Sequence, residues 1–283
     1  MVSGKHAQTG QRTPEQIREH YEIEKKLASQ LRDATREERR SLYSSLYDEL
    51  FRRVPSHPQL TDKAEPSQRL VAAKREMRFL KRFLTEGSTF LEIGPGDCAV
   101  SCEVARHVRQ VYAIDVSDEI SRLAETPANF RLVLSDGCSV PVPSGSVDVA
   151  YSNQLMEHLH PDDAFEQLEA VRDALAPGGR YICVTPNRLS GPHDVSCYFD
   201  SVATCFHLRE YSVTELRELF DRVGFSKVAV YVGARGVFVR FPATLVLLGE
   251  RVVEALPQKA GRWVAHSLPV RLFLNGIRLA ATK

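Results

Sequence analysis

The chain has 283 residues, which is enough for one domain with sizeable additions or for two small domains. Its 43% apolar and 26% charged residues are typical of a soluble globular protein, and a formal net charge of +1 provides no overall attraction for nucleic acid. No stretch of 18 apolar residues is present and the first residues lack an apolar leader, so we expect a cytoplasmic protein.

Three helical patterns come first in the chain. The stretches TPEQ (13–16) and TREE (35–38) are capping signals, and an apolar face at helical spacing follows each of them. A third helix is predicted from about Ser67, after a link that contains prolines. We therefore predict a helical N-terminal cap over residues 1–85 and a separate domain over residues 86–283.

Strands and helices alternate in the next part of the chain. The predicted strands are TFLEI (89–93), QVYAI (110–114), NFRLVL (129–134), VDVAYS (147–152) and RYICVT (180–185), and the predicted helices cover 97–108, 118–125 and 162–175. This alternation predicts an α/β fold with a parallel sheet and right-handed crossovers. Ligands of such sheets bind beyond the carboxyl ends of the strands.

The last part of the chain departs from this alternation. Residues 188–211 form a long connection without periodicity, and such connections often act as lids or binding segments. A capped helix over 212–223 and a strand, SKVAVYV (226–232), follow, and GIRLAATK (276–283) reads as the final strand. We expect residues 235–274 to form two or three amphipathic helices inserted between these two strands.

The stretch LEIGPGDC contains a glycine turn between a strand and a helix. Gly94 and Gly96 in the pattern G-x-G-x-x-A suit the pyrophosphate of a dinucleotide, which a nicotinamide-dependent oxidoreductase would bind. Glu92, however, would repel a pyrophosphate and attract an ammonium group. S-adenosylmethionine has an ammonium group, a sulfonium and no phosphate, so Glu92 favours that cofactor.

Two aspartates follow the next strands. Asp115 ends the second strand and can accept hydrogen bonds from both ribose hydroxyls of a nucleoside. Asp136 follows the third strand, where it can accept from an adenine amino group, and Gly137 allows close approach. Either aspartate could instead cap a turn, but their joint position favours contact with the cofactor.

Four segments in order resemble the class I S-adenosylmethionine-dependent methyltransferases: FLEIGPGDC, VYAIDVS, SDGCSVPVPSGSVDVAYSNQLMEHL and DALAPGGRYICVTPN. The resemblance extends over about residues 43–233 and the final strand. It implies a Rossmann-like, seven-stranded, mostly parallel sheet whose last two strands form an antiparallel hairpin. It also implies S-adenosylmethionine as the cofactor, bound by Tyr47, Glu92, Gly94, Gly96, Asp115, Val116, Asp136, Gly137 and Asn153.

Two parts of this resemblance are open to another interpretation or depart from the family pattern. Tyr47, or its neighbour Tyr43, would cover the cofactor from an N-terminal helix, although packing between helices explains an aromatic residue there equally well. Cys98 stands where the family has the third glycine of its motif, and we expect it to tighten the cofactor pocket.

Methyl transfer from a sulfonium is a direct displacement, so orientation of the reactants supplies much of the acceleration. A base is needed only when the acceptor arrives protonated, as an alcohol or a phenol does. The candidate catalytic residues are His193, Asp194 and His207, all in the long connection, with Glu157-His158 as a further pair. We favour His207 because it closes that connection, while a role in capping or packing is an open alternative.

A metal ion is a second possibility at the same place. Some members of the family, including small-RNA methyltransferases, hold a divalent cation with an E-x-x-E-H segment and a later histidine. This chain has Gln154, Glu157 and His158, followed by His207, so a neutral amide replaces one carboxylate. Loss of a carboxylate weakens a site for a hard cation, and we predict that no metal is bound.

The insert over residues 235–274 is basic and amphipathic. Such helices can lie on a membrane surface or receive a lipid-linked substrate. They can also bury their apolar faces on the sheet or on a second subunit, which is the interpretation we favour. The protein is then a monomer or a homodimer.

These features lead to an expected function: O-methylation of a small-molecule acceptor, such as a natural product or a saccharide, in a biosynthetic pathway. The alternatives are N-methylation of a small molecule, methylation of a lipid-linked substrate and metal-dependent 2'-O-methylation of small RNA. A scaffold that binds the cofactor without catalysis is a further alternative. The balanced net charge makes nucleic acid a disfavoured partner.

Overall fold

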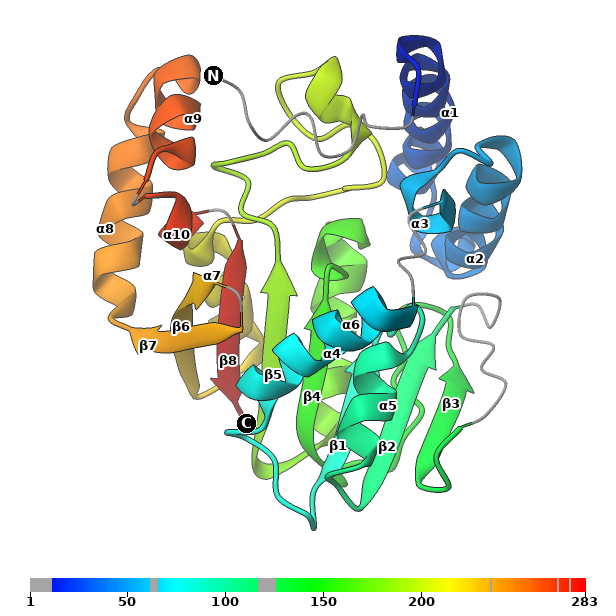
Figure 1. Ribbon diagram of the computed structural model, residues 1–283, viewed down its shortest axis with the longest axis vertical. Helices are drawn as coiled ribbons and strands as arrows, with labels where there is room; N and C mark the ends of the chain where they lie inside the picture. Colours follow the sequence, from blue (N-terminus) through cyan, green and yellow to red (C-terminus); the bar gives the residue numbers. More distant parts are fainter. Residues whose placement is uncertain (1–11, 62–65, 117–125, 235, 269, 275) are drawn as a thin grey trace.

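The computed structural model describes residues 12–61, 66–116, 126–234, 236–268, 270–274 and 276–283, so the predicted helix over 118–125 lies outside the described residues. One eight-stranded sheet forms the centre, in the order β3-β2-β1-β4-β5-β8-β6-β7 (Figure 1). The strands are β1 (Thr89–Ile93), β2 (Gln110–Asp115), β3 (Phe130–Leu134), β4 (Val147–Asn153), β5 (Leu175–Thr185), β6 (Lys227–Ala234), β7 (Val237–Phe241) and β8 (Ile277–Thr282).

The strand directions agree with the expected α/β class. Strands β1 to β5 are parallel to one another, whereas β8 runs antiparallel to both of its neighbours, β5 and β6. The carboxyl ends of the parallel strands β1 to β5 therefore lie along one edge of the sheet, and most of the predicted cofactor residues lie at or just after these ends.

The strand β7 corrects the prediction. We expected seven strands and a wholly helical insert, but Val237–Phe241 form an eighth strand that pairs antiparallel with β6. Alternating β-branched and aromatic residues favour a strand here. A side chain at Gly233 would collide with the backbone of Val237, so glycine permits this tight hairpin. The rest of the insert is helical: α8 (Ala243–Glu254), α9 (Gln258–His266) and α10 (Arg271–Leu274).

Helices cover both faces of the sheet, because successive side chains of a strand point to opposite faces. Phe90 belongs to the core shared with α4 (Pro66–Leu80) and α5 (Ala99–Ala105). Leu91 belongs to the opposite core, shared with α6 (Pro161–Ala174) and α7 (Val213–Val223). Both faces are thus buried, as in other sheets with helical crossovers.

The N-terminal helices lie beyond the carboxyl ends of the strands (Figure 1). They are α1 (Pro14–Asp33), α2 (Arg36–Arg53) and the short α3 (Pro58–Thr61). Both predicted capping boxes are confirmed, since Thr13 and Thr35 each accept from the backbone N–H three residues later. Together with the connection after β5, these helices enclose the edge of the sheet where a ligand is expected.

Residues 188–211 after β5 form a loop with one short 3-10 helix, Val195–Tyr198; we call it the lid loop. Helix α1 holds this loop. Glu24 accepts from the backbone N–H of Phe206 at 2.9 Å, and Tyr21 donates to the carboxylate of Asp200 at 2.8 Å. The Arg32 guanidinium donates to three backbone carbonyls of the lid loop, those of Thr204, Cys205 and His207, at 2.7, 2.8 and 3.3 Å.

Candidate active site

A cavity of about 180 Å³ lies at the carboxyl ends of β1, β2 and β4, under α2. Among the residues predicted to bind the cofactor, the following line it: Tyr47, Gly94, Gly96, Asp115, Val116 and Gly137. Tyr43 lines it as well. The fold therefore brings together residues that are spread over about a third of the chain.

The glycines shape this cavity. Gly94 and Gly96 have φ angles of +66° and +53°, which favour glycine. Gly137, with φ at +88°, faces Tyr43 so closely that an added Cβ would lie 3.1 Å from the tyrosine ring. The Tyr47 hydroxyl lies 2.9 Å from Nδ1 of His158, so hydrogen bonding orients this aromatic wall.

Three predicted cofactor residues do not line the cavity. Glu92 lies buried behind the glycine turn, where the Ser101 hydroxyl donates a hydrogen bond to it. Burial raises the pKa of Glu92 to about 8, because the charged form loses its hydration. Asn153 is exposed at the end of β4.

Asp136 is the third of these residues. Its Oδ1 accepts from the backbone N–H groups of Cys138 and Ser139, at 3.0 and 2.7 Å, and its Oδ2 lies 3.6 Å from the Arg40 guanidinium. The carboxylate thus caps the turn that carries Gly137, and its contact with adenine stays a prediction.

Cys98 does not tighten the cavity, contrary to our expectation. Its side chain is fully buried in the core shared with α4 and α5 and is not part of the cavity wall. Its backbone nevertheless has a left-handed conformation, which favours glycine, with φ at +56°. The replacement of glycine therefore changes the backbone energy and the core rather than the pocket.

The lid loop brings two candidate histidines to one carboxylate. Oε1 of Glu210 accepts from the backbone N–H of His193 at 2.7 Å and lies 2.7 Å from Nδ1 of His207, and Oε2 lies 3.3 Å from Nδ1 of His193. Burial alone would raise the pKa of Glu210, but the hydrogen bonds with both histidines lower it to about 2. An ionised Glu210 therefore holds His207 in one orientation.

His207 is buried, and burial alone would lower its pKa. The hydrogen bond with Glu210 and the charges of Glu157 and Asp194 outweigh that effect, so the pKa of His207 is raised. Because Nδ1 is bonded to Glu210, Nε2 is the ring atom left for chemistry. The predicted base is thus held in one orientation by a carboxylate, as catalytic histidines commonly are.

Asp194 has a different environment from that of the two histidines. It accepts from the backbone N–H of Ser196 at 3.0 Å, from that of Cys205 at 3.1 Å and from that of His207 at 3.4 Å. Burial raises its pKa. These contacts make Asp194 a positioning residue of the lid loop, and its predicted part in catalysis stays untested.

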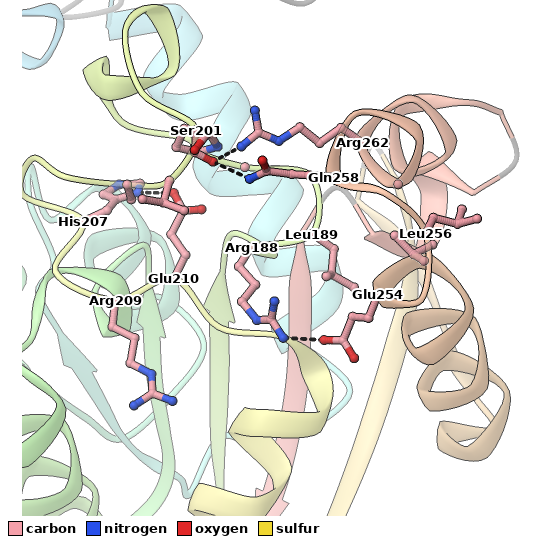
Figure 2. A pocket seen from close by; sticks show the side chains of 16 residues that line it. Arg188, Leu189, Ser201, His207, Arg209, Glu210, Glu254, Leu256, Gln258 and Arg262 are labelled. Carbon is pink, nitrogen blue, oxygen red and sulfur yellow. Dashed lines mark hydrogen bonds and ion pairs between the residues drawn. The ribbon is translucent and has the colours of Figure 1, made fainter.

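A second cavity, of about 620 Å³, lies between the lid loop and helices α8 and α9 (Figure 2). His207 lines this cavity, whereas His158 lines the cofactor cavity. The two rings meet edge to face with centroids 4.9 Å apart. The pair of histidines therefore forms part of the wall between the two cavities.

Part of this chain resembles known proteins. A family profile described as a methyltransferase domain matches residues 91–183. A probable S-adenosylmethionine-dependent methyltransferase of Mycolicibacterium smegmatis is 33% identical over 142 residues, which is 49% of this chain and 52% of that protein. A protein of the same description from Mycobacterium tuberculosis is 29% identical over 144 residues, covering 50% of this chain and 49% of its own.

The fold has counterparts among solved structures. One is a complex between the Trm112 methyltransferase activator of Haloferax volcanii and a putative methyltransferase; it has a TM-score of 0.52 and 17% identity and covers 77% of this chain and 94% of its own. The chain contains a class I S-adenosylmethionine-dependent methyltransferase domain. It spans about half the length of the curated relatives it matches.

S-adenosylmethionine is the cofactor of this methyltransferase domain, and the residues present fit it. Asp115 lines the cavity with a carboxylate, a group that can accept hydrogen bonds from ribose hydroxyls, and Gly137 lies against the Tyr43 ring, where no side chain would fit. The ionisable Glu92 lies directly behind the glycine turn. No cationic side chain lines this cavity among the described residues, which suits a cationic cofactor better than a pyrophosphate.

Three of the residues considered as metal ligands lie close together in the structure. Glu157, His158 and His207 each place one ligand atom within 4.8 Å of the others. Oε1 of Glu157 is buried without a hydrogen-bond partner, and burial raises the pKa of this carboxyl. Nδ1 of His158 lies 3.1 Å from the carbonyl of Phe206, and Nδ1 of His207 lies 2.7 Å from Glu210, so the Nε2 atom of each ring is available. In metal sites, too, a hydrogen bond at the second ring nitrogen usually orients the histidine ligand.

A second group, His20, Glu24 and His57, also has three ligand atoms within 4.8 Å. Its hydrogen bonds do not suit a metal. Nδ1 of His20 lies 2.9 Å from the Arg12 guanidinium, and Nδ1 of His57 accepts from a backbone N–H at 3.2 Å, so both Nε2 atoms carry the proton in the neutral rings. This buried group instead links α1 to the lid loop through Glu24.

Sequence reasoning did not predict several residues of the cofactor cavity. These are Asp48, Phe51, Gln59, Ile93, Ile114, Ser135, Ser139, Gln154, Leu155, Leu159 and Gln167. Gln154 has a φ angle of +57°, which is uncommon for a residue with a side chain and marks the turn after β4. The apolar residues of this group lack a motif, because an apolar wall needs only a surface of the right shape.

Proposed function

We propose that the protein transfers a methyl group from S-adenosylmethionine to an oxygen atom of a small-molecule acceptor. The cofactor cavity supports the donor, and His207 supports oxygen as the acceptor atom. An alcohol or a phenol must lose a proton during the transfer, whereas a neutral amine can react without a base.

One observation carries this proposal: His207 lies in the wall between the cofactor cavity and the larger cavity, with its Nδ1 bonded to the ionised Glu210. When bound, S-adenosylmethionine supplies the electrophilic methyl group. Nε2 of His207 accepts the proton of the acceptor hydroxyl, and Glu210 stabilises the imidazolium that forms. The lid loop and α2 exclude water and hold the reactants in line.

Binding of the donor is tested first, by titration calorimetry of the full chain with S-adenosylmethionine. The proposal predicts saturable binding, and Gly94→Val, which places a side chain against Leu155 at a left-handed position, should reduce the affinity at least about tenfold. Gly87→Val, at a site with nothing within 4 Å, is the control. Absence of binding to the wild-type chain would remove the proposal.

The base is tested with an acceptor found by screening phenols and saccharides with isotopically labelled cofactor. We expect His207→Gln to lower kcat about 10² to 10⁴-fold while the affinity for the cofactor stays within about twofold. The matched control, His266→Gln, changes an exposed histidine on α9 and should leave kcat unchanged. Equal effects of the two substitutions, or methylation confined to amines, would rule out His207 as the base of an O-methyltransferase.

A second candidate function is metal-dependent methylation of a 2'-hydroxyl, as expected of small-RNA methyltransferases. The unpartnered Oε1 of Glu157 beside His158 and His207 favours it, because a cation would satisfy that oxygen. These three residues would hold the ion. Dialysis against Mn²⁺ or Co²⁺ followed by elemental analysis should then show about one ion per chain, which Glu157→Gln abolishes. No retained ion in the wild-type chain would exclude this candidate.

A further inference from the structure

The larger cavity lies where the acceptor of the proposed reaction must enter. Its walls come from the lid loop on one side and from α8 and α9 on the other (Figure 2), and the His207 ring contacts that of His158, which lines the cofactor cavity. Its volume, about 620 Å³, falls within the range of small-molecule sites. The chemistry of its walls therefore bears on the class of acceptor.

Most of the charged groups of this cavity already have a partner. The Arg188 guanidinium bonds to Glu254 and lies 2.8 Å from Glu215. The Arg209 guanidinium lies 3.5 Å from the same Glu215. Glu210 is engaged by the two histidines of the lid loop. These groups compensate one another and leave little net charge for a ligand.

Arg262 differs from the other charged groups. Its guanidinium, on α9, donates to the backbone carbonyl of Ser201, and Gln258 donates to the same oxygen at 3.3 Å (Figure 2). No carboxylate of the described residues forms an ion pair with Arg262. The wall thus carries a half-buried guanidinium bonded to a neutral carbonyl, with further N–H donors beside the cavity.

A guanidinium of this kind recognises oxyanions. Its planar set of donors matches a carboxylate or a phosphate in a two-point hydrogen bond, and charge-assisted bonds of this type are about twice as strong as neutral ones. A neutral ligand would leave Arg262 without an ionic partner in the cavity, whereas an oxyanion would supply one.

We propose that the acceptor is a small molecule that carries an oxyanion, a carboxylate or a phosphate. Arg262 binds this group, and the acceptor hydroxyl lies at the other side of the cavity, beside His207. The inference rests on the proposed methyl transfer, because it treats the larger cavity as the acceptor site. It also assigns a role to the helical insert, which supplies the specificity of the reaction.

The test uses the full chain saturated with S-adenosylhomocysteine and inorganic phosphate as the probe, followed by ³¹P NMR line broadening. We expect saturable binding in the millimolar range, weakened at least about fivefold by Arg262→Gln. Arg251→Gln, which removes an exposed arginine of α8 outside the cavity, should change the affinity less than twofold. Equal effects of the two substitutions, or no saturable binding in the wild-type chain, would overturn the inference.

A parallel titration with acetate distinguishes the two oxyanions, because the natural group should be mimicked by the probe that depends more strongly on Arg262. Calorimetry with S-adenosylmethionine on the Arg262→Gln chain shows whether that chain is folded. If the cofactor binds and the oxyanions do not depend on Arg262, only this inference fails. If the cofactor does not bind the wild-type chain, the proposed function fails as well.

Discussion

At the scale of single residues, the Glu92 carboxyl is a buried acid directly behind the cofactor turn. Its pKa is raised to about 8 by burial, so the unliganded protein holds a neutral Glu92 at pH 7. The unfolded chain releases this proton near pH 4.5, and the stability of the unliganded protein should therefore fall as the pH rises from about 4.5 to 8. An ammonium group brought close to Glu92 would favour the ionised form instead.

The first prediction follows from this charge. If the ammonium group of the cofactor pairs with Glu92, binding at pH 6.5 should release about one proton, and Glu92→Gln should release about none. Calorimetry in two buffers of different ionisation enthalpy measures this number. Asp97→Asn, at a half-exposed carboxylate near the same turn, is the control and should behave as the wild type. The same proton count in all three chains would show that Glu92 does not meet the ammonium group.

The second prediction concerns Cys98. Its left-handed φ angle of +56° strains any residue with a Cβ, so Cys98→Gly should be about 1 kcal/mol more stable than Cys98→Ala, although both lose the buried sulfur. Urea unfolding of the two variants measures the difference. At Ala72, an exposed position inside α4, glycine should be about 1 kcal/mol less stable than alanine. The same order at both positions would contradict the strained backbone.

At the scale of elements, α1 and the lid loop form one unit. The Arg32 guanidinium reaches three carbonyls of the segment that ends at His207, and Glu24 accepts from the N–H of Phe206. Helix α8 is held in a similar way. Its buried Glu250 accepts from the backbone N–H groups of Val213 and Thr214, at the first turn of α7, at 2.7 and 2.9 Å. The additions to the sheet are therefore fastened by buried polar groups.

The third prediction tests the hold of α1 on the lid loop. Arg32→Met removes hydrogen bonds from a charged group, which typically contribute about 1.5–3 kcal/mol, so amide exchange at residues 205–207 should accelerate at least about tenfold. The matched control is Lys26→Met, which changes an exposed residue of the same helix. Hydrogen exchange read by mass spectrometry measures both. Unchanged exchange in the Arg32 variant would show that other contacts suffice to order the loop.

At the scale of the whole molecule, the cofactor cavity is built by α2, three strands and the loops after them, so it exists only in the folded chain.

Among the described residues, no helix has both the length and the apolar character needed to cross a bilayer. Helix α8 packs one side, with Val246 and Val253 buried, and exposes Leu245 and Leu248 on another side.

The fourth prediction uses the dependence of the cavity on folding. S-adenosylmethionine at 100 times its Kd should raise the free energy of unfolding by about 2.7 kcal/mol, and Tm by several degrees. NAD⁺ at the same concentration should not raise Tm, because Asp115 and the buried Glu92 give a pyrophosphate no positive partner. Thermal unfolding followed by fluorescence checks both ligands. A larger shift with NAD⁺ would restore the dinucleotide interpretation of the glycine turn.

Local patterns predicted the strands β1 to β6 and the capped helices α1, α2 and α7 well, because burial on both faces and capping leave signals within a few neighbouring residues. The strand β7 was missed. Val237, Phe238 and Val239 follow one another without a polar residue between them, so the short segment lacks the apolar–polar alternation that identifies a strand, and its pairing depends on β6.

The motifs alone are enough to identify the donor, since the glycine turn, Asp115 and the order of the segments reflect the requirements of one cofactor. Tertiary structure was needed to bring Glu210 to His193 and His207, to bring Glu157 and His158 to His207, and to enclose a second cavity under the insert. The physical reason is that a cofactor site repeats the same local turns in many proteins. An acceptor site instead depends on the shape and charge of segments that meet only when the chain has folded.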